Sequence, residues 1–156
     1  MRWEELSEAP CSMARSLAIL GDRWTLLILR DAFLKVRRFD DFQKSLGIAR
    51  RVLSERLQKL VDGGVLIRVS YQENPERFEY RLTQMGLDLY PVVLSLVHWG
   101  DKYFGGTEGP PILHTHKECG HDFQSVLTCS HCSEAVLPHD VIARPGGGFK
   151  RPETTS

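Results

Sequence analysis

Three of the four cysteines stand close together late in the chain, in a pattern that could bind a metal ion. Cys129 and Cys132 form a Cys-x2-Cys pair, and His116 and Cys119 upstream have the same two-residue gap. Two such pairs can offer four ligands at the corners of a tetrahedron, which suits structural zinc. The pattern therefore predicts a structural Zn²⁺ site, with His121 as the rival fourth ligand. Thiols without metal, or an oxidised Cys129–Cys132 pair, are the alternatives.

Arginine and glutamine side chains that could contact DNA lie on an expected basic helix over residues 50–62. Leu53, Leu57 and Leu60 recur at helical spacing and mark the face that packs on a core. The other face carries polar and charged side chains: Arg51, Ser54, Glu55, Gln58 and Lys59, with Arg50 in the first turn. Arginine can bind guanine and glutamine can bind adenine through two hydrogen bonds, and either can hold phosphate. The alternative is a surface helix with a solvated face.

Two strands joined by a polar turn are expected after this helix. Gly63-Gly64 can end the helix in a left-handed conformation without a steric cost. Residues 65–71 are apolar and β-branched, residues 72–76 have turn chemistry, and residues 77–82 alternate in polarity. Arg77 at the tip could lie beside the DNA backbone or minor groove, or it could be an ordinary surface arginine.

The order of elements predicts a winged helix-turn-helix. A short helix beginning near Phe39 leads through Gly47 into the basic helix, and the hairpin follows. Just before that short helix, Lys35, Arg37 and Arg38 could either clamp a phosphate or belong to a solvated loop. The expected fold class is mainly α with a small β-hairpin wing, plus a small β-rich, zinc-ribbon-like tail.

Helices are expected on either side of the winged helix-turn-helix, where they can support it and join it to a second subunit. Asp22 is a good N-cap for a buried helix over residues 23–35, and an earlier helix is expected from Pro10. After the wing, Thr83 caps a helical pattern over residues 84–104, which Pro91 must kink or split because it lacks an amide donor. The apolar stripe of this pattern predicts pairing with a second subunit. Folding back on its own domain is the alternative.

The length of 156 residues fits one main domain and a small appendage. We expect a DNA-binding and dimerisation domain over 1–104, a linker over 105–113, a Cys/His extension over 114–142 and a disordered tail over 143–156. The sequence shows no signal peptide, membrane-spanning run or lipidation motif, so a cytoplasmic location is expected.

Charge is distributed unevenly although the formal net charge is zero. Residues 35–81 carry 11 basic and 7 acidic side chains, against 4 and 5 in residues 1–34 and 5 and 8 in residues 82–156. The positive surplus is thus confined to the expected reading elements, as electrostatic docking on DNA requires. Because the surplus is modest, tight binding would need two copies of the chain.

The chain closely resembles the HxlR-type winged helix-turn-helix transcription regulators, relatives of the MarR group. The resemblance rests on separate blocks in the right order: CSMARSLAILGDRWTLLILRDAF, RRFDDFQKSLGIARRVLSERLQKLVDGGVLIRVSYQENPERFEYRLT, LYPVVLSL and HWGD. It runs from Cys11 to about Phe104 and into the tail, and some members have a similar tail. It implies a homodimer that binds palindromic double-stranded promoter DNA and regulates transcription, with repression as the expected effect, in response to a small molecule or redox signal.

The resemblance also points to individual residues. The matching positions for DNA contact are Arg50, Arg51, Ser54, Arg56 and Arg77, to which the reasoning above adds Arg38 and Gln58. Many members have Ser-Pro where this chain has Ala49-Arg50, so its recognition helix begins without a side-chain cap.

Cys11 stands where some members of the family carry a cysteine that senses quinones, aldehydes or oxidants. It follows Pro10 at an expected helix start, where a thiolate is stabilised, and the thiolate is the reactive form. Arg15 could assist. The alternative is a small buried thiol that packs and does not react.

An enzyme and a protein-interaction adaptor are the two other classes of function that the sequence could indicate. A zinc or thiol enzyme is disfavoured for two reasons. No carboxylate that could act as a general base stands in a motif with the cysteines, and the sequence shows no pair of nucleophile and base. The other is a zinc-stabilised protein-interaction adaptor without specific DNA binding. Salt-dependent, sequence-specific binding to DNA would distinguish the regulator from both.

Overall fold

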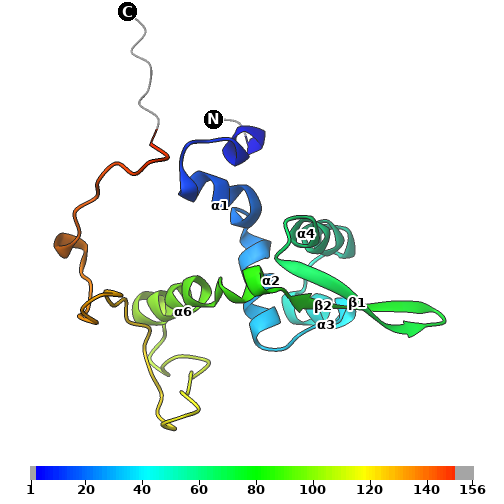
Figure 1. Ribbon diagram of the computed structural model, residues 1–156. Helices are drawn as coiled ribbons and strands as arrows, with labels where there is room; N and C mark the ends of the chain where they lie inside the picture. The colour runs from blue at the N-terminus through cyan, green and yellow to red at the C-terminus, as the bar shows by residue number, and fades with distance from the viewer. Residues whose placement is uncertain (1–2, 150–156) are drawn as a thin grey trace, which may run out of the picture. The chain divides into compact units, whose positions relative to one another are not determined.

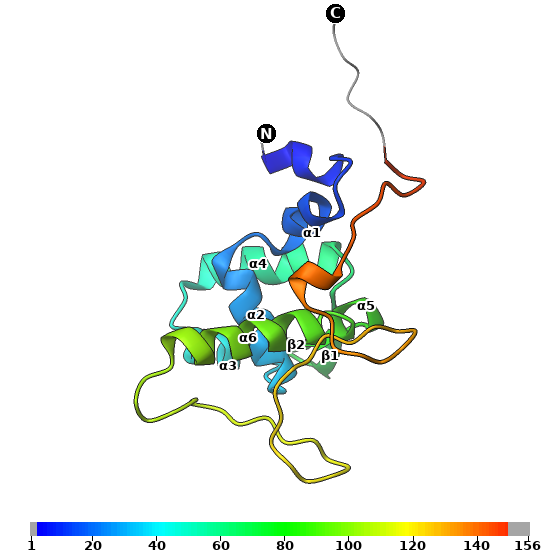
Figure 2. The same cartoon turned by 90° about the vertical axis from the view of Figure 1, so that its left-hand side faces the viewer.

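The structure is a computed structural model that describes residues 3–149 (Figure 1, Figure 2). The chain divides into two compact units, Met1–Val93 and Leu94–Ser156. The elements of the first unit are η1 (Trp3–Ser7), α1 (Ser12–Leu20), α2 (Arg23–Phe33), α3 (Phe39–Leu46), α4 (Arg50–Asp62), β1 (Leu66–Glu73), β2 (Glu76–Leu82) and α5 (Gln84–Leu87). Helix α6 (Tyr90–Phe104) begins in the first unit and continues into the second.

Helix α2 is the centre of the first unit, and α3, α4 and the hairpin all pack against it. Its N-cap is Asp22, as predicted, and the Asp22 carboxylate accepts a hydrogen bond from the Trp24 amide at 2.9 Å. Ile28 and Leu29 of α2 are fully buried with Phe42 of α3. These side chains form one core with the leucines of α4 and with residues 65 and 66 at the start of the hairpin.

The turn between α3 and α4 is fixed by a left-handed glycine. Gly47 has φ +62° and its N–H donates to the Gln43 carbonyl, so the turn closes without a side-chain clash. The next residue, Ile48, is buried in the core. At the other end of α4 the left-handed residue is Gly64 (φ +73°), whereas Gly63 keeps a negative φ.

The predicted hairpin is present, and Figure 1 shows it projecting away from the helices of the first unit. Strands β1 and β2 are antiparallel and both run further toward the tip than the sequence pattern indicates, so that Glu73 pairs with Glu76. A bulge near Tyr71 interrupts the register. Residues 37 and 38 add a short third edge, because Tyr80 N donates to the Arg37 carbonyl at 2.7 Å and Arg38 forms a bridge with Glu79.

The long helical pattern after the wing is split, as the proline predicts. Thr83 caps α5 by accepting a hydrogen bond from the Gly86 amide at 3.1 Å, and α5 ends at Leu87. Pro91 is the second residue of α6, a position at which the missing N–H has no helical partner to lose. The described helices include none that is long and apolar enough to cross a membrane.

The second unit contains most of α6, the short helix η2 (Pro138–Asp140) and otherwise irregular chain. Two isolated β-bridges, Thr115–Asp122 and Thr128–Ala135, are the only strand pairing in its described part. His98 of α6 accepts a hydrogen bond at Nδ1 from the Ser125 amide at 2.8 Å, which holds the extension to the helix. The zinc-ribbon-like fold and the domain limits at residues 104, 113 and 142 stay predictions, and residues 150–156 of the predicted disordered tail lie outside the described part.

Candidate nucleic-acid interface

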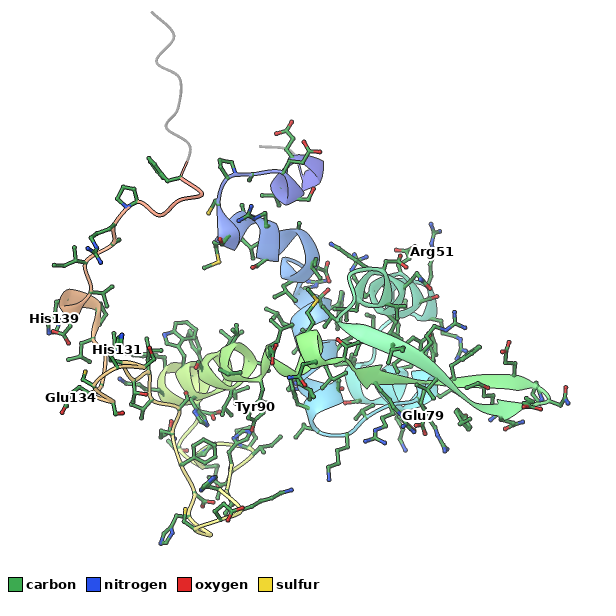
Figure 3. All side chains as sticks on the ribbon, in the orientation of Figure 1. Arg51, Glu79, Tyr90, His131, Glu134 and His139 are labelled. Atoms are coloured by element: carbon green, nitrogen blue, oxygen red, sulfur yellow. The ribbon has the colours of Figure 1, made fainter. Side chains whose placement is uncertain are left out.

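Helix α4 has one buried face and one exposed face. Leu53, Leu57 and Leu60 have no exposed surface, as the sequence predicts. On the other side, the Arg51 side chain is 91% exposed, and Ser54 and Gln58 are also exposed. Figure 3 shows Arg51 pointing away from the body of the first unit. The helix therefore presents hydrogen-bonding groups outward from a position that its leucines fix.

The exposed side chains of α4 are held by partners on the surface. The Arg51 Nε atom lies 3.0 Å from Glu55 Oε1, one helical turn away. One turn further, the Gln58 amide donates to Asp62 at 2.7 Å. These contacts extend both side chains along the exposed face of the helix.

Arg50 connects the start of α4 to α3. Its Nη1 atom donates to Asp40 at 3.0 Å and to Gln43 at 2.9 Å, and its guanidinium stacks 4.7 Å from the centre of the Phe39 ring. The N-cap residue Ala49 makes no side-chain hydrogen bond, as the sequence indicates. Arg50 thus braces the helix-turn-helix at the point where a side-chain cap is missing, while its own side chain remains 66% exposed.

Arg56 has a different environment from the other predicted contacts. Its side chain is 27% exposed, and its Nε atom lies 3.0 Å from Asp22 Oδ1. Partial burial raises the pKa of Asp22, but the Arg56 guanidinium and the Trp24 amide outweigh this effect, so the pKa of Asp22 is below its ordinary value. Arg56 therefore fastens α4 to the start of α2, and a contact with DNA stays a prediction for this residue.

A group of arginines surrounds Glu79 where the wing meets the segment before α3 (Figure 3). Arg81 donates to Glu79 at 2.9 Å, and Arg38 lies 3.7 Å from the same carboxylate. The hydrogen bond from Arg81 holds the pKa of Glu79 below its ordinary value, and the charges of Arg38 and Arg37 add to this effect. Arg38 also stacks 4.5 Å from the Tyr71 ring of β1.

Sequence reasoning missed Arg81 as a member of this group, although the polar alternation of β2 placed it on the outer side of the strand. Arg77, the predicted wing contact, is exposed beside the two-residue tip and pairs in register with Gln72. Arg38 and Arg81 thus meet at the same carboxylate, and Arg50 contacts α3. Arg77 lies apart from both, at the far end of the hairpin.

The cysteines lie apart from these arginines in the sequence and make separate local contacts. Cys11 is exposed at the N-cap position of α1 and makes no capping hydrogen bond with its side chain. Arg15, the predicted helper, donates to Ser12 instead, at 3.3 Å. A thiolate role for Cys11 stays a prediction.

The predicted zinc ligands are brought together in two pairs. His116 Nδ1 lies 3.4 Å from Cys119 Sγ. Hydrogen bonds from the backbone N–H groups of Cys132 and His131, and then from the Cys132 side chain, lower the pKa of Cys129. Across residues 3–149, no set of three or more His, Cys, Asp and Glu side chains is placed to hold a metal ion.

The fold and the exposed face of α4 define a winged helix-turn-helix DNA-binding protein. The profile of the HxlR-like helix-turn-helix family matches residues 19–108. The chain is 48% identical over 139 residues to Rv3095 of Mycobacterium tuberculosis, a protein called an HTH-type transcriptional regulator, covering 89% of this chain and 88% of that protein. The chain therefore belongs to the HxlR-like helix-turn-helix family, and it is a transcription regulator and not an enzyme.

Solved structures agree with this assignment. PA1607, described as a candidate transcription factor, superposes with a TM-score of 0.80 at 33% identity, covering 90% of this chain and 98% of its own. The redox regulator HypR in its reduced form superposes with a TM-score of 0.55 at 28% identity, covering 59% of this chain and 92% of its own. The likeness to HypR thus spans a smaller part of the chain than the likeness to PA1607.

Replacing Asp22 with alanine removes both the α2 cap and the ion pair with Arg56, and should lower the free energy of unfolding by about 1–2 kcal/mol. Because the fold lowers the pKa of Asp22, this stabilisation is present above the unfolded-state value of about 3.9 and is lost as the pH falls through the folded value. Urea unfolding at several pH values measures the difference.

Asp40→Ala is the control for this prediction, because the Asp40 side chain is 80% exposed in its pair with Arg50 and should contribute little. Equal losses for the two variants at neutral pH would contradict the assigned role of Asp22.

Proposed function

We propose that the protein is a homodimer that places two copies of α4 in successive major grooves of a palindromic promoter site. The observation that carries this proposal is the orientation of α4, whose leucines are fully buried while Arg51, Ser54 and Gln58 face solvent. A helix in the major groove can read bases with such side chains. Repression by occupying promoter DNA is the proposed effect, and the cytoplasm of a bacterium, where promoter DNA lies, is the proposed location.

The wing and the segment before α3 supply the proposed backbone contacts. Arg77 is exposed at the tip of the hairpin, and Arg38 is 55% exposed at its base. Contacts of this kind fix the register of a protein on DNA without reading sequence. We therefore assign base reading to α4 and phosphate binding to the wing and its neighbouring arginines.

The proposed dimer surface is an apolar stripe on α6, here called the α6 stripe. Its members recur at helical spacing and are each about half exposed: Val92, Leu96, Trp99 and Tyr103. On α1, Met13 and Leu17 are also exposed, 68% and 42%, and α1 has no buried residue. Exposed apolar stripes on two helices require a partner surface, and a second copy of the chain supplies a matching one.

A second candidate function is a redox response at Cys11. The thiol is exposed just before Met13 and Leu17, the exposed apolar side chains of α1, and the similar structure HypR is described as a redox regulator. An electrophile added to the Cys11 sulfur, or a disulfide between the Cys11 residues of two protomers, would change the packing of α1 in the dimer. The separation of the two α4 helices would change with it, and DNA affinity would fall.

Arg51→Ala should weaken binding to the operator by about 1–3 kcal/mol, roughly 5- to 150-fold, if Arg51 contacts a base. Gel-shift titrations with the promoter DNA beside the gene measure this loss. Arg144→Ala is the matched control, because it removes the same charge from an exposed position of the C-terminal extension. An equal loss in both variants would contradict base reading by α4.

Wild-type binding in the same assay separates a regulator from an interaction adaptor. A dimer that neutralises phosphates should lose affinity steeply with salt, with a log–log slope of about −0.9 per phosphate. An adaptor without specific DNA binding would show neither this slope nor a preference for the promoter over scrambled DNA.

Leu96→Lys should convert the dimer to a monomer, because it places a charge in the centre of the α6 stripe, and it should also abolish binding to the paired half-sites. Light scattering after size exclusion gives the mass. Ile142→Lys, a change at an apolar side chain that is 85% exposed, should leave the dimer intact. A dimeric Leu96→Lys variant would refute the proposed surface.

Cys11→Ser should keep operator binding and lose its release by oxidants or electrophiles. The gel-shift assay with and without a quinone measures both properties. Release that persists in Cys11→Ser would exclude Cys11 as the sensor, while wild-type protein that never releases DNA would exclude the redox response itself.

A further inference from the structure

Two loops of the second unit share one backbone structure although their sequences differ. The first loop is residues 114–123 and the second loop is residues 127–136. Three backbone hydrogen bonds of the first loop recur in the second loop, 13 residues later. In the first loop they run from Phe123 N to His114 O (3.0 Å), from His116 N to His121 O (2.9 Å) and from Gly120 N to His116 O (2.8 Å). In the second loop they run, in the same order, from Val136 N to Leu127 O (2.8 Å), from Cys129 N to Glu134 O (2.9 Å) and from Ser133 N to Cys129 O (2.8 Å). The two isolated β-bridges occupy matching positions as well.

The matching residues include a left-handed position in each loop. Gly120 has φ +70° and Ser133 has φ +61°. A serine adopts this conformation only rarely, because its Cβ crowds the backbone there. The shared conformation therefore belongs to the loop structure itself and does not follow from the freedom of glycine alone.

The repeat places the four predicted ligands at two equivalent pairs of positions. His116 corresponds to Cys129, and Cys119 corresponds to Cys132. With Zn–N of about 2.0–2.1 Å and Zn–S of about 2.3 Å, two ligands of a tetrahedral zinc ion lie about 3.6 Å apart. The observed distance of 3.4 Å from His116 Nδ1 to Cys119 Sγ is close to this value.

The second pair has the backbone arrangement that suits a metal-bound sulfur. The N–H groups of His131 and Cys132 both point at the Cys129 sulfur, and the second loop is marked in Figure 3 by His131 and Glu134. N–H groups that surround a ligand atom hold it in a fixed orientation toward a metal ion. All four cysteines of the chain are free thiols in the structure, so neither pair is consumed by a disulfide.

The extension also lacks a core that could hold it together. No residue between 105 and 149 is buried. Apolar side chains at the start of the second loop remain exposed, including Val126 just before it at 67% and Leu127 within it at 71%. A segment of this size without a hydrophobic core needs another source of stability, and a structural metal is a common one.

We propose that the two loops are the halves of one structural zinc site, in which His116, Cys119, Cys129 and Cys132 are the four ligands. Each loop already presents a chelating pair, and zinc binding joins the two pairs. The three residues between the loops keep them within reach of each other, and Ser125 in this segment is held by His98 of α6. On binding, each of the three thiols loses its proton to solvent and no electron is transferred.

The repeat also decides between the two histidines considered as the fourth ligand. His121 corresponds to Glu134, and its carbonyl accepts the hydrogen bond that closes the first loop. His116 corresponds to a cysteine that lies in a pair with Cys132. The repeat therefore selects His116.

Zinc content is measured on the full chain purified without chelator, by mass spectrometry of the metal and by release to a colorimetric chelator. We expect about one zinc ion per chain. His116→Ala and Cys119→Ser should lose most of the metal, whereas His121→Ala and His131→Ala should retain it. The proposal would be overturned if wild-type protein incubated with Zn²⁺ holds less than a tenth of a zinc ion per chain, about ten-fold under the expected content. Loss of zinc in His121→Ala with retention in His116→Ala would also overturn it.

Cobalt substitution keeps the test valid if the ligand variants fold poorly. Co²⁺ added to the wild-type chain should give the visible bands of a tetrahedral ion and thiolate-to-cobalt absorption from about three sulfurs. A six-coordinate cobalt spectrum, or thiols that react equally fast with and without Zn²⁺, would contradict the site. Helical circular dichroism of each variant reports whether the first unit remains folded.

Discussion

The burial of three leucines on α4 is the interaction on which the orientation of its exposed face depends. Fully burying a leucine side chain stabilises a fold by about 1.5–3 kcal/mol, and Leu53, Leu57 and Leu60 are all completely buried. An exposed ion pair such as Arg51–Glu55 contributes about 0–1 kcal/mol. Rotation of α4 about its axis would therefore cost more stabilisation free energy than any surface ion pair could supply. The buried leucines thus determine the direction in which the outer side chains point.

Polar contacts complete the positioning of α4 at points that the leucines do not reach. Asp22 caps α2 and binds Arg56, so one carboxylate links the central helix to the recognition helix. Arg50 links the start of α4 to α3. Glu79 has the corresponding role in the wing, where it joins β2 to the segment that precedes α3. The contacts of Asp22 and Glu79 connect elements that are separated in the sequence, and the contact of Arg50 connects two consecutive helices.

Features that depend on neighbouring residues could be predicted from the sequence, and features that depend on distant partners could not. The leucine spacing of α4, the turn at Gly47, the left-handed helix stop at Gly64, the Asp22 cap and the break near Pro91 are all local, and each is present. The inward position of Arg56 was not predictable, because its partner Asp22 lies 34 residues earlier (56 − 22 = 34). The longer wing depends on cross-strand pairing. The sequence shows the shared two-residue gap of the two Cys/His pairs, but the common backbone structure of residues 114–123 and 127–136 depends on hydrogen bonds that the sequence does not show.

The pairing of the arginines with carboxylates has a consequence for the proposed binding to DNA. Four exposed arginines already have an acidic neighbour in the same chain: Arg50 with Asp40, Arg51 with Glu55, and Arg38 and Arg81 with Glu79. If these arginines contact DNA as proposed, each phosphate must displace a carboxylate, which reduces the gain from charge alone by about 0–1 kcal/mol for each exposed pair. A cognate sequence adds base hydrogen bonds that the carboxylates cannot imitate. In the proposed function, the acidic residues would thus lower the affinity for unrelated DNA and increase the discrimination between sites.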